Sequence, residues 1–195
     1  MKSVSNIALE YTTTSNEQKQ RELLLLLVSY FLTLYDMEKE NFADELGISS
    51  EFVEDAQIKF DYMKKIELTL QNMRETVQSE KDKDKDSEAL TALYFNRILN
   101  TDGKKAKELA QIETAKHLTR LDRSKKIRKR WKAFSGCCDV CRAMDGVTVA
   151  LDEPFMYQGQ VVELSSGERY INNYAAMDTP NAHPNDKCSI EFIIE

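Results

Sequence analysis

The chain has 195 residues and a net charge of −6, and 42% of its residues are apolar. With only six glycines and three prolines, this composition is typical of a packed, largely helical protein, either one domain or a helical body with a small appendix. The N-terminus lacks the succession of basic, apolar and small residues that marks a secretory signal. The apolar run from Leu23 to Tyr35 is shorter than the roughly 20 residues that cross a bilayer, so it predicts a helix buried on most faces rather than a membrane segment.

Periodic apolar residues predict a mainly α-helical N-terminal body over residues 1–130. Its clearest element is a long amphipathic helix from Glu51 to about Gln78, in which apolar residues recur every three or four positions. Before it, the sequence predicts an extended lead-in over 1–14, a helix from a capping box at Thr14 or Ser15 to about Tyr35, and a short helix from Phe42 to Gly47. After it, the sequence predicts a charged linker over about 79–87, a helix from Asp86 or Ser87 to near Asp102-Gly103, and a last helix that continues as a basic helix over about 116–132.

The charge of the chain is unevenly distributed. Residues 116–132 contain nine Lys or Arg and one Asp, a net charge of +8, so the rest of the chain carries −14. This density of cations favours phosphate groups without reading base sequence, although a solvated helix face anchored by Trp131 and Phe134 would show the same pattern. The residues predicted to contact nucleic acid or an acidic partner are Arg123, Lys125, Lys126, Arg128, Lys129, Arg130 and Lys132.

The hydrophobic period changes after Gly146. Short strand-like runs occupy Val147–Leu151, Gln160–Leu164 and Glu191–Glu195, and Asp-Gly, Gln-Gly and Ser-Gly pairs supply turns between them. The sequence therefore predicts an α+β protein, in which a small β-rich module over 131–195 follows the helical body.

All four cysteines and one of the two histidines lie in this module. Cys138 and Cys141 are separated by two residues, so their thiolates can chelate one metal ion from a tight turn, and His183 and Cys188 can complete a tetrahedral Cys3His zinc site. The alternative is a set of free reduced cysteines, because an intracellular protein keeps its thiols reduced. Zinc, if bound, is predicted to be structural.

The sequence shows no constellation typical of an enzyme. Only His117 and His183 offer an imidazole base, and His183 belongs to the predicted metal cluster. A catalytic zinc ion needs an open coordination position, whereas this cluster offers four protein ligands. We therefore expect a protein that is not an enzyme, with a metal-dependent hydrolase as a minor alternative.

The order of residues in the C-terminal module resembles a known family. Trp131, Cys138-x-x-Cys141 with Asp145-Gly146, Glu153-Pro154-Phe155 and His183-Pro184-x-x-x-Cys188 resemble the C-terminal module of phage head morphogenesis proteins, the minor head proteins typified by the Mu F protein. Ile112-Glu113-Thr114 resembles a Thr-Glu element that precedes the Trp in that family. The resemblance covers roughly residues 106–192.

One position departs from the family pattern, which closes with His-Pro-x-Cys-x-Cys. Asp186 occupies the place of the first closing cysteine, so Cys188 is the only thiol of the closing motif. Asp186 could serve as a substitute oxygen ligand.

The resemblance implies a minor capsid protein of a phage or prophage, with a structural role in head morphogenesis and in capsid and portal assembly. Its expected partners are the portal and other capsid proteins, in an oligomer within the particle, with no membrane. Its expected location is the virion, in the capsid interior or near the portal, after assembly in the host cytoplasm. Contact with packaged DNA through non-specific phosphate interactions is a further expectation. The alternative function is a standalone nucleic-acid-binding protein that uses the basic helix and the zinc module.

Overall fold

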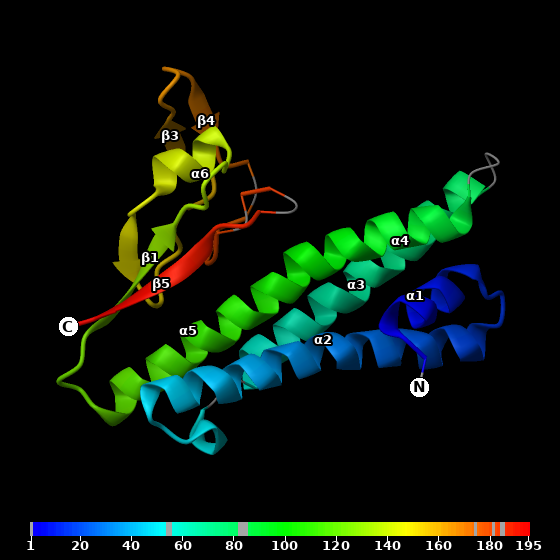
Figure 1. The fold of residues 1–195 in the computed structure, drawn as a ribbon, viewed down its shortest axis with the longest axis horizontal. Coiled ribbons are helices and arrows are strands. Elements are labelled where there is room, and N and C mark those ends of the chain that lie inside the picture. The colour runs from blue at the N-terminus through cyan, green and yellow to red at the C-terminus, as the bar shows by residue number, and fades with distance from the viewer. Residues whose placement is uncertain (1, 54–55, 82–85, 174, 181, 184–185) are drawn as a thin grey trace. The chain divides into compact units, whose positions relative to one another are not determined.

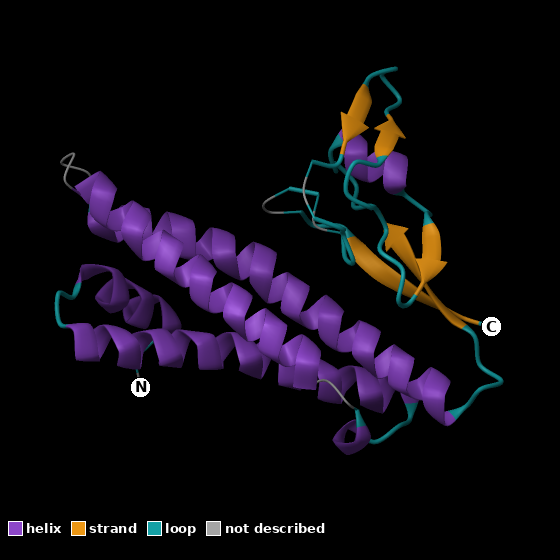
Figure 2. Cartoon of the chain, turned by 180° about the vertical axis from the view of Figure 1, so that it is seen from behind, coloured by secondary structure: helices purple, strands orange, loops and turns teal. Residues whose placement is uncertain are grey.

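The computed structural model describes residues 2–53, 56–81, 86–173, 175–180, 182–183 and 186–195. The fold is α+β, as predicted, with long helices and two small antiparallel sheets (Figures 1 and 2). The chain forms two compact units. The first unit comprises Met1–Glu38 and Asp55–Lys107, and the second comprises Lys39–Glu54 and Glu108–Glu195.

The first unit is helical. It contains α1 (Val4–Thr13), most of α2 (Glu17–Leu46), α3 (Ala56–Lys81), α4 (Ser87–Ile98) and a π-helical segment, η2 (Leu99–Gly103), that leads into α5 (Lys104–Leu121). The predicted stripe of the long helix is confirmed in its second half, where the side chains of Ile66, Leu70, Met73 and Val77 are buried. The helices pack through apolar side chains, for example Phe31 of α2 edge-on against Phe95 of α4, with ring centroids 6.4 Å apart.

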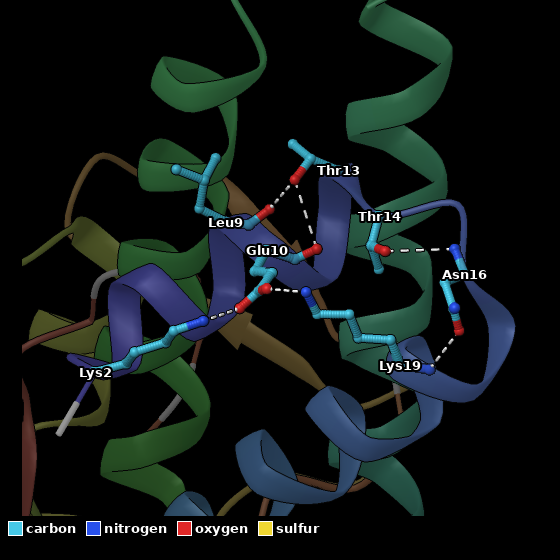
Figure 3. Close-up of polar contacts among 7 residues, drawn as sticks. All are labelled: Lys2, Leu9, Glu10, Thr13, Thr14, Asn16 and Lys19. Carbon is cyan, nitrogen blue, oxygen red and sulfur yellow. Dashed lines mark hydrogen bonds and ion pairs between the residues drawn. The ribbon is translucent and has the colours of Figure 1, made fainter.

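The N-terminal segment is a helix, so the predicted extended lead-in is wrong. Ser3 caps α1 by accepting a hydrogen bond from the amide of Asn6. The next helix, α2, is capped by Asn16 rather than by Thr14 or Ser15, because the side-chain oxygen of Asn16 accepts the amide of Lys19 at 2.9 Å. Lys2 and Lys19 both pair with Glu10 across this corner (Figure 3). The hydrogen bond from Lys19, followed by that from Lys2, lowers the pKa of Glu10 to about 2.

Two predicted helix breaks are absent from the described chain. The α2 helix continues without interruption to Leu46, and the predicted stop near Asp102-Gly103 is a π-helical segment between α4 and α5. Tyr62 of α3 stabilises this segment, since its hydroxyl donates to the backbone oxygen of Asp102 at 2.7 Å. The predicted linker over about 79–87 is wrong at both ends, because α3 extends to Lys81 and Asp86 caps α4. The part of the prediction that falls on residues 82–85 lies outside the described residues.

The apolar run of α2 is buried on one side only. Leu27, Phe31 and Tyr35 are fully buried, whereas Leu25 and Leu26 are 69% and 54% exposed. The expectation of burial on most faces is therefore wrong. A search of the described helices finds none with the length and apolar character that a membrane span requires.

The second unit is built on a three-stranded sheet. Strand β1 (Ile127–Lys132) lies between β2 (Thr148–Ala150) and β5 (Ser189–Ile194), and both pairings are antiparallel. Strands β3 (Val161–Glu163) and β4 (Arg169–Ile171) form a separate hairpin, and the short helix α6 spans Asp139–Met144. The three predicted strands are confirmed with shifted ends, whereas β1 and β4 were not predicted.

The basic segment is the largest difference from the sequence-based expectation. The α5 helix ends at Leu121, and a turn follows in which the carboxylate of Asp122 accepts the amide and the hydroxyl of Ser124. Residues 127–132 then form a strand whose side chains alternate between buried and more exposed positions. The predicted basic helix over 116–132 is therefore wrong beyond Leu121.

The compact units also divide the chain differently from the predicted boundary between residues 130 and 131. Within the second unit, Ala115 and Leu118 of α5 form a core cluster with Ile127 and Leu151. Phe42, Leu46, Ile48 and Phe192 pack against that cluster. The C-terminal half of α5 therefore belongs with the sheet, because its apolar face is buried there.

Candidate metal centre

The first half of the centre is a tight turn that begins α6. Cys138 is the N-cap of this helix, and its sulfur accepts a hydrogen bond from the amide of Cys141 at 3.4 Å. Two residues between the cysteines are enough to bring both thiols to the same end of the helix. Cys141 is buried and Cys138 is half-buried.

The second half lies just before β5. Cys188 precedes the first residue of this strand and is 1% exposed, and its sulfur accepts the amide of Phe134 at 3.4 Å. Strand β5 pairs with β1 along its whole length, including Trp131 opposite Ile190. This pairing holds Cys188 beside the segment that leads from β1 to the first pair of cysteines.

The predicted ligands come together. The ligand atoms of Cys138, Cys141 and His183 lie within 4.8 Å of one another, as do those of Cys141, Asp186 and Cys188. The two groups share Cys141, and together they place the five side chains close enough to hold a metal ion. Three sulfurs with one imidazole nitrogen form a donor set typical of zinc. His183 is exposed, and its neighbour Pro184 in the predicted motif lies outside the described residues.

Burial governs the protonation of the inner thiols. Desolvation raises the pKa of Cys141, and the hydrogen bond to Asp186 raises it further. Desolvation also raises the pKa of Cys188. Both groups are therefore protonated thiols at neutral pH, and binding of a metal ion would release these protons.

The centre rests on an apolar cluster that contains two of its ligands. Trp131, Cys141, Met144, Phe155, Met156, Met177 and Cys188 form this cluster. The rings of Trp131 and Phe155 meet edge-on with centroids 5.4 Å apart. Packing of the ligands into the core ties the metal centre to the fold of the second unit.

Asp145 and Gly146 have a structural role in the turn between α6 and β2. The carboxylate of Asp145 accepts the amide of Ala133 at 2.8 Å, and the amide of Gly146 donates to the backbone oxygen of Trp131 at 2.8 Å. Gly146 has φ 78°, a left-handed conformation that favours glycine. These hydrogen bonds therefore hold the turn between α6 and β2 against the end of β1.

An open pocket of about 370 Å³ adjoins the metal centre. It is lined by Phe134, Gly136, Cys137, Cys138, His183, Asp186 and Lys187. Cys137 is half-buried and belongs to neither group of potential ligands among the described residues. It is therefore a spare thiol beside the centre.

The predicted cationic contact residues fall into three sets according to their exposure. Arg123, Lys126, Arg128 and Lys132 are exposed, whereas Lys125 and Arg130 are half-buried. Arg130 forms an ion pair of 3.2 Å with Glu191 on the neighbouring strand. Lys129 is only 1% exposed, so its inclusion among the surface contacts is wrong. Its position on the inner face follows from the strand alternation that the sequence-based prediction of a helix missed.

Comparisons of the chain with protein-family models, with curated proteins and with solved structures find no match.

Proposed function

We propose that this chain is a minor head protein of a phage or prophage, with a structural role in head morphogenesis. The observation that carries the proposal is the common location of the residues that resemble the family pattern. Trp131, Cys141, Phe155 and Cys188 share one core cluster, and Asp145 and Gly146 form the turn beside it. These residues are spread over nearly 60 positions, so their convergence on one centre supports a shared structural purpose.

The proposed cofactor is one structural zinc ion held by Cys138, Cys141, His183 and Cys188. The donor set fits the ion in number and chemistry, since three thiolates and one imidazole fill a tetrahedral site. The two groups of neighbouring ligand atoms share Cys141, which supports one centre that includes all four side chains. A bound zinc ion would supply a cross-link between the segment around α6 and the segment before β5. The side chains would exclude water from it on the core side, where Cys141 and Cys188 are buried.

In this proposal the two units have different tasks. The helical unit presents exposed apolar side chains, among them Leu25, Leu26 and Leu93, which would contact portal or capsid subunits. The metal module would provide a rigid end. A Cys3His arrangement fills all four coordination positions of the ion and leaves none open for a substrate or water. This supports a structural rather than an enzymatic role.

A standalone nucleic-acid-binding protein is the second candidate function. The observation in its favour is the outward row of Arg128, Arg130 and Lys132 on β1, preceded by exposed Arg123 and Lys126. Such cations favour phosphate groups by charge. The negative charge of Glu191 beside Arg130 weakens this case.

The composition of phage particles tests the proposal. Heads would be purified from an induced culture of a host that carries the gene, with and without a stop codon early in that gene. We expect the chain in intact heads at a few copies per particle, and few mature heads from the stop-codon strain. A plasmid copy of the gene should restore head formation. Normal heads that lack the chain would contradict the proposal.

A further inference from the structure

Asp186 holds both closing ligands of the candidate metal centre through their backbone. Its side chain is buried, and one carboxylate oxygen accepts the amide of Cys188 at 2.8 Å. The other oxygen accepts the amide of Ala182 at 3.2 Å. Cys188 is itself a potential ligand, and Ala182 directly precedes His183. A single carboxylate therefore fixes the chain on both sides of the closing loop.

The backbone of Asp186 reinforces this arrangement. Its amide donates to the backbone oxygen of His183 at 3.2 Å. Among the described residues, Asp186 is thus hydrogen-bonded to Ala182, His183 and Cys188, which are the two potential ligands and the residue before one of them.

The number of available ligands argues against direct coordination by Asp186. Structural zinc sites are almost always tetrahedral with four ligands, and three thiolates with one imidazole fill those four positions. The two carboxylate oxygens of Asp186 already accept the amides of Ala182 and Cys188, which compensate the charge of the carboxylate in an outer position.

The contact between Asp186 and Cys141 fits the same role. The thiol of Cys141 donates to the carboxylate at 3.1 Å. The contact places the carboxylate beside this sulfur, while the two carboxylate oxygens also accept the amides of Ala182 and Cys188.

We propose that Asp186 is a positioning residue that orients His183 and Cys188 toward the metal ion and does not coordinate the ion itself. This inference rests on the proposed metal centre. It also explains how the site can keep four ligands although the family pattern has a cysteine at this position. Groups that orient metal ligands in this way typically affect metal affinity by about 10- to 100-fold.

Cobalt(II) titration of the full chain under reducing, oxygen-free conditions tests the role of Asp186. The visible bands of cobalt(II) report the number and type of its ligands. We expect one equivalent to bind, with the same band positions in the unsubstituted chain, Asp186→Asn and Asp186→Ala. Affinity should fall by about 10- to 100-fold in Asp186→Ala and by less in Asp186→Asn, which retains one acceptor oxygen. His183→Ala, which removes a proposed ligand, should shift the bands.

Three results would overturn the inference in distinguishable ways. A band shift in Asp186→Asn similar to that of His183→Ala would make Asp186 a ligand and leave the metal centre intact. Failure of the unsubstituted chain to bind cobalt(II) would remove the metal centre itself. Amide hydrogen exchange of the metal-free chain provides a check that needs no ion. Exchange at Ala182 and Cys188 should accelerate in Asp186→Ala but not in His183→Ala, and unchanged exchange in Asp186→Ala would contradict the positioning role.

Discussion

Lys129 is the residue whose environment differs most from its sequence-based interpretation. Its amine donates to the backbone oxygen of Asp178 at 3.0 Å and lies 5.1 Å from the centroid of the Phe155 ring. Burial lowers the pKa of Lys129 to about 8, and the carboxylate of Asp178 partly opposes this effect. The second unit thus contains a buried cation that is costly to keep charged.

Because the pKa of Lys129 is lowered in the folded state, we expect the free energy of unfolding to depend on pH. Below pH 8 the amine is charged in both the folded and the unfolded state, so the full desolvation cost is present. Between pH 8 and the unfolded value of 10.5 the folded amine is neutral while the unfolded one is charged. The folded state binds fewer protons there, so this contribution to the free energy of unfolding rises with pH, by up to about 3 kcal/mol.

Denaturant unfolding at several pH values checks this effect in the second unit, because Trp131 is the only tryptophan and lies there. The free energy of unfolding of the unsubstituted chain minus that of Lys129→Met should rise from pH 8 to pH 10. Taking this difference cancels the titration of the thiols. Lys132→Met, at an exposed position of the same strand, is the matched control for the removal of one cation. A constant difference for Lys129→Met would refute the account of this residue.

Local spacing was enough to predict some of the site residues and not others. Cys138 and Cys141 could be paired from sequence because a separation of two residues fixes their geometry. The hydrogen bonds that Asp186 accepts from Ala182 and Cys188 could not be predicted, since they depend on how the segment before β5 folds. The burial of Lys129 depends on strand alternation.

At the scale of elements, helix existence was easier to predict than helix ends. The α3 stripe is a strong local signal. The continuity of α4 and α5 could not be predicted from Asp102-Gly103, because tertiary contacts stabilise the π-helical segment there. The hydroxyl of Tyr62 donates to the backbone oxygen of Asp102, and the amine of Lys65 pairs with the carboxylate of Asp102 at 3.1 Å. The strand β1 was missed because its cations resemble a helix face, whereas its pairing with β2 and β5 is non-local.

The exposed face of β1 yields a prediction about nucleic acid. If the second candidate function holds, the full chain binds duplex DNA at low salt, and affinity falls steeply as salt is added. Replacing Arg128 and Lys132 by Gln should then reduce the slope of log affinity against log salt by about 1 for each lost phosphate contact. A double change at Lys81 and Lys107, exposed lysines of the helical unit, serves as the charge-matched control.

Equilibrium fluorescence anisotropy with a labelled duplex measures this effect. An equal loss of affinity in the β1 variant and in the control would show that net charge alone drives binding. No binding of the unsubstituted chain at low salt would remove the nucleic-acid function altogether.

At the scale of the whole molecule, the sequence predicted an α+β protein with a cysteine module. The structure contains both the helices and the small sheets that this prediction requires. The division of the chain could not be predicted, because residues 39–54 join the second unit through non-local packing. Phe42 meets Phe192 with ring centroids 5.0 Å apart, although the two residues are distant in sequence. Periodicity describes each segment alone and contains no information on such partners.

In the proposed metal centre, one ion joins the two halves of the cysteine module. Removal of the ion should expose the cluster around Trp131, because Cys141 and Cys188 are part of it. The helical content should remain nearly intact, since the first unit has its own buried core around Leu27, Phe31 and Ile66.

Metal analysis of the full chain, purified without chelator, tests this claim most directly. We expect about one zinc ion per chain in the unsubstituted protein and in Cys137→Ser, and a large loss of zinc in Cys138→Ser. The comparison of neighbouring cysteines separates coordination from general thiol binding. A chain that contains no zinc, or one that loses zinc equally in both variants, would contradict the account.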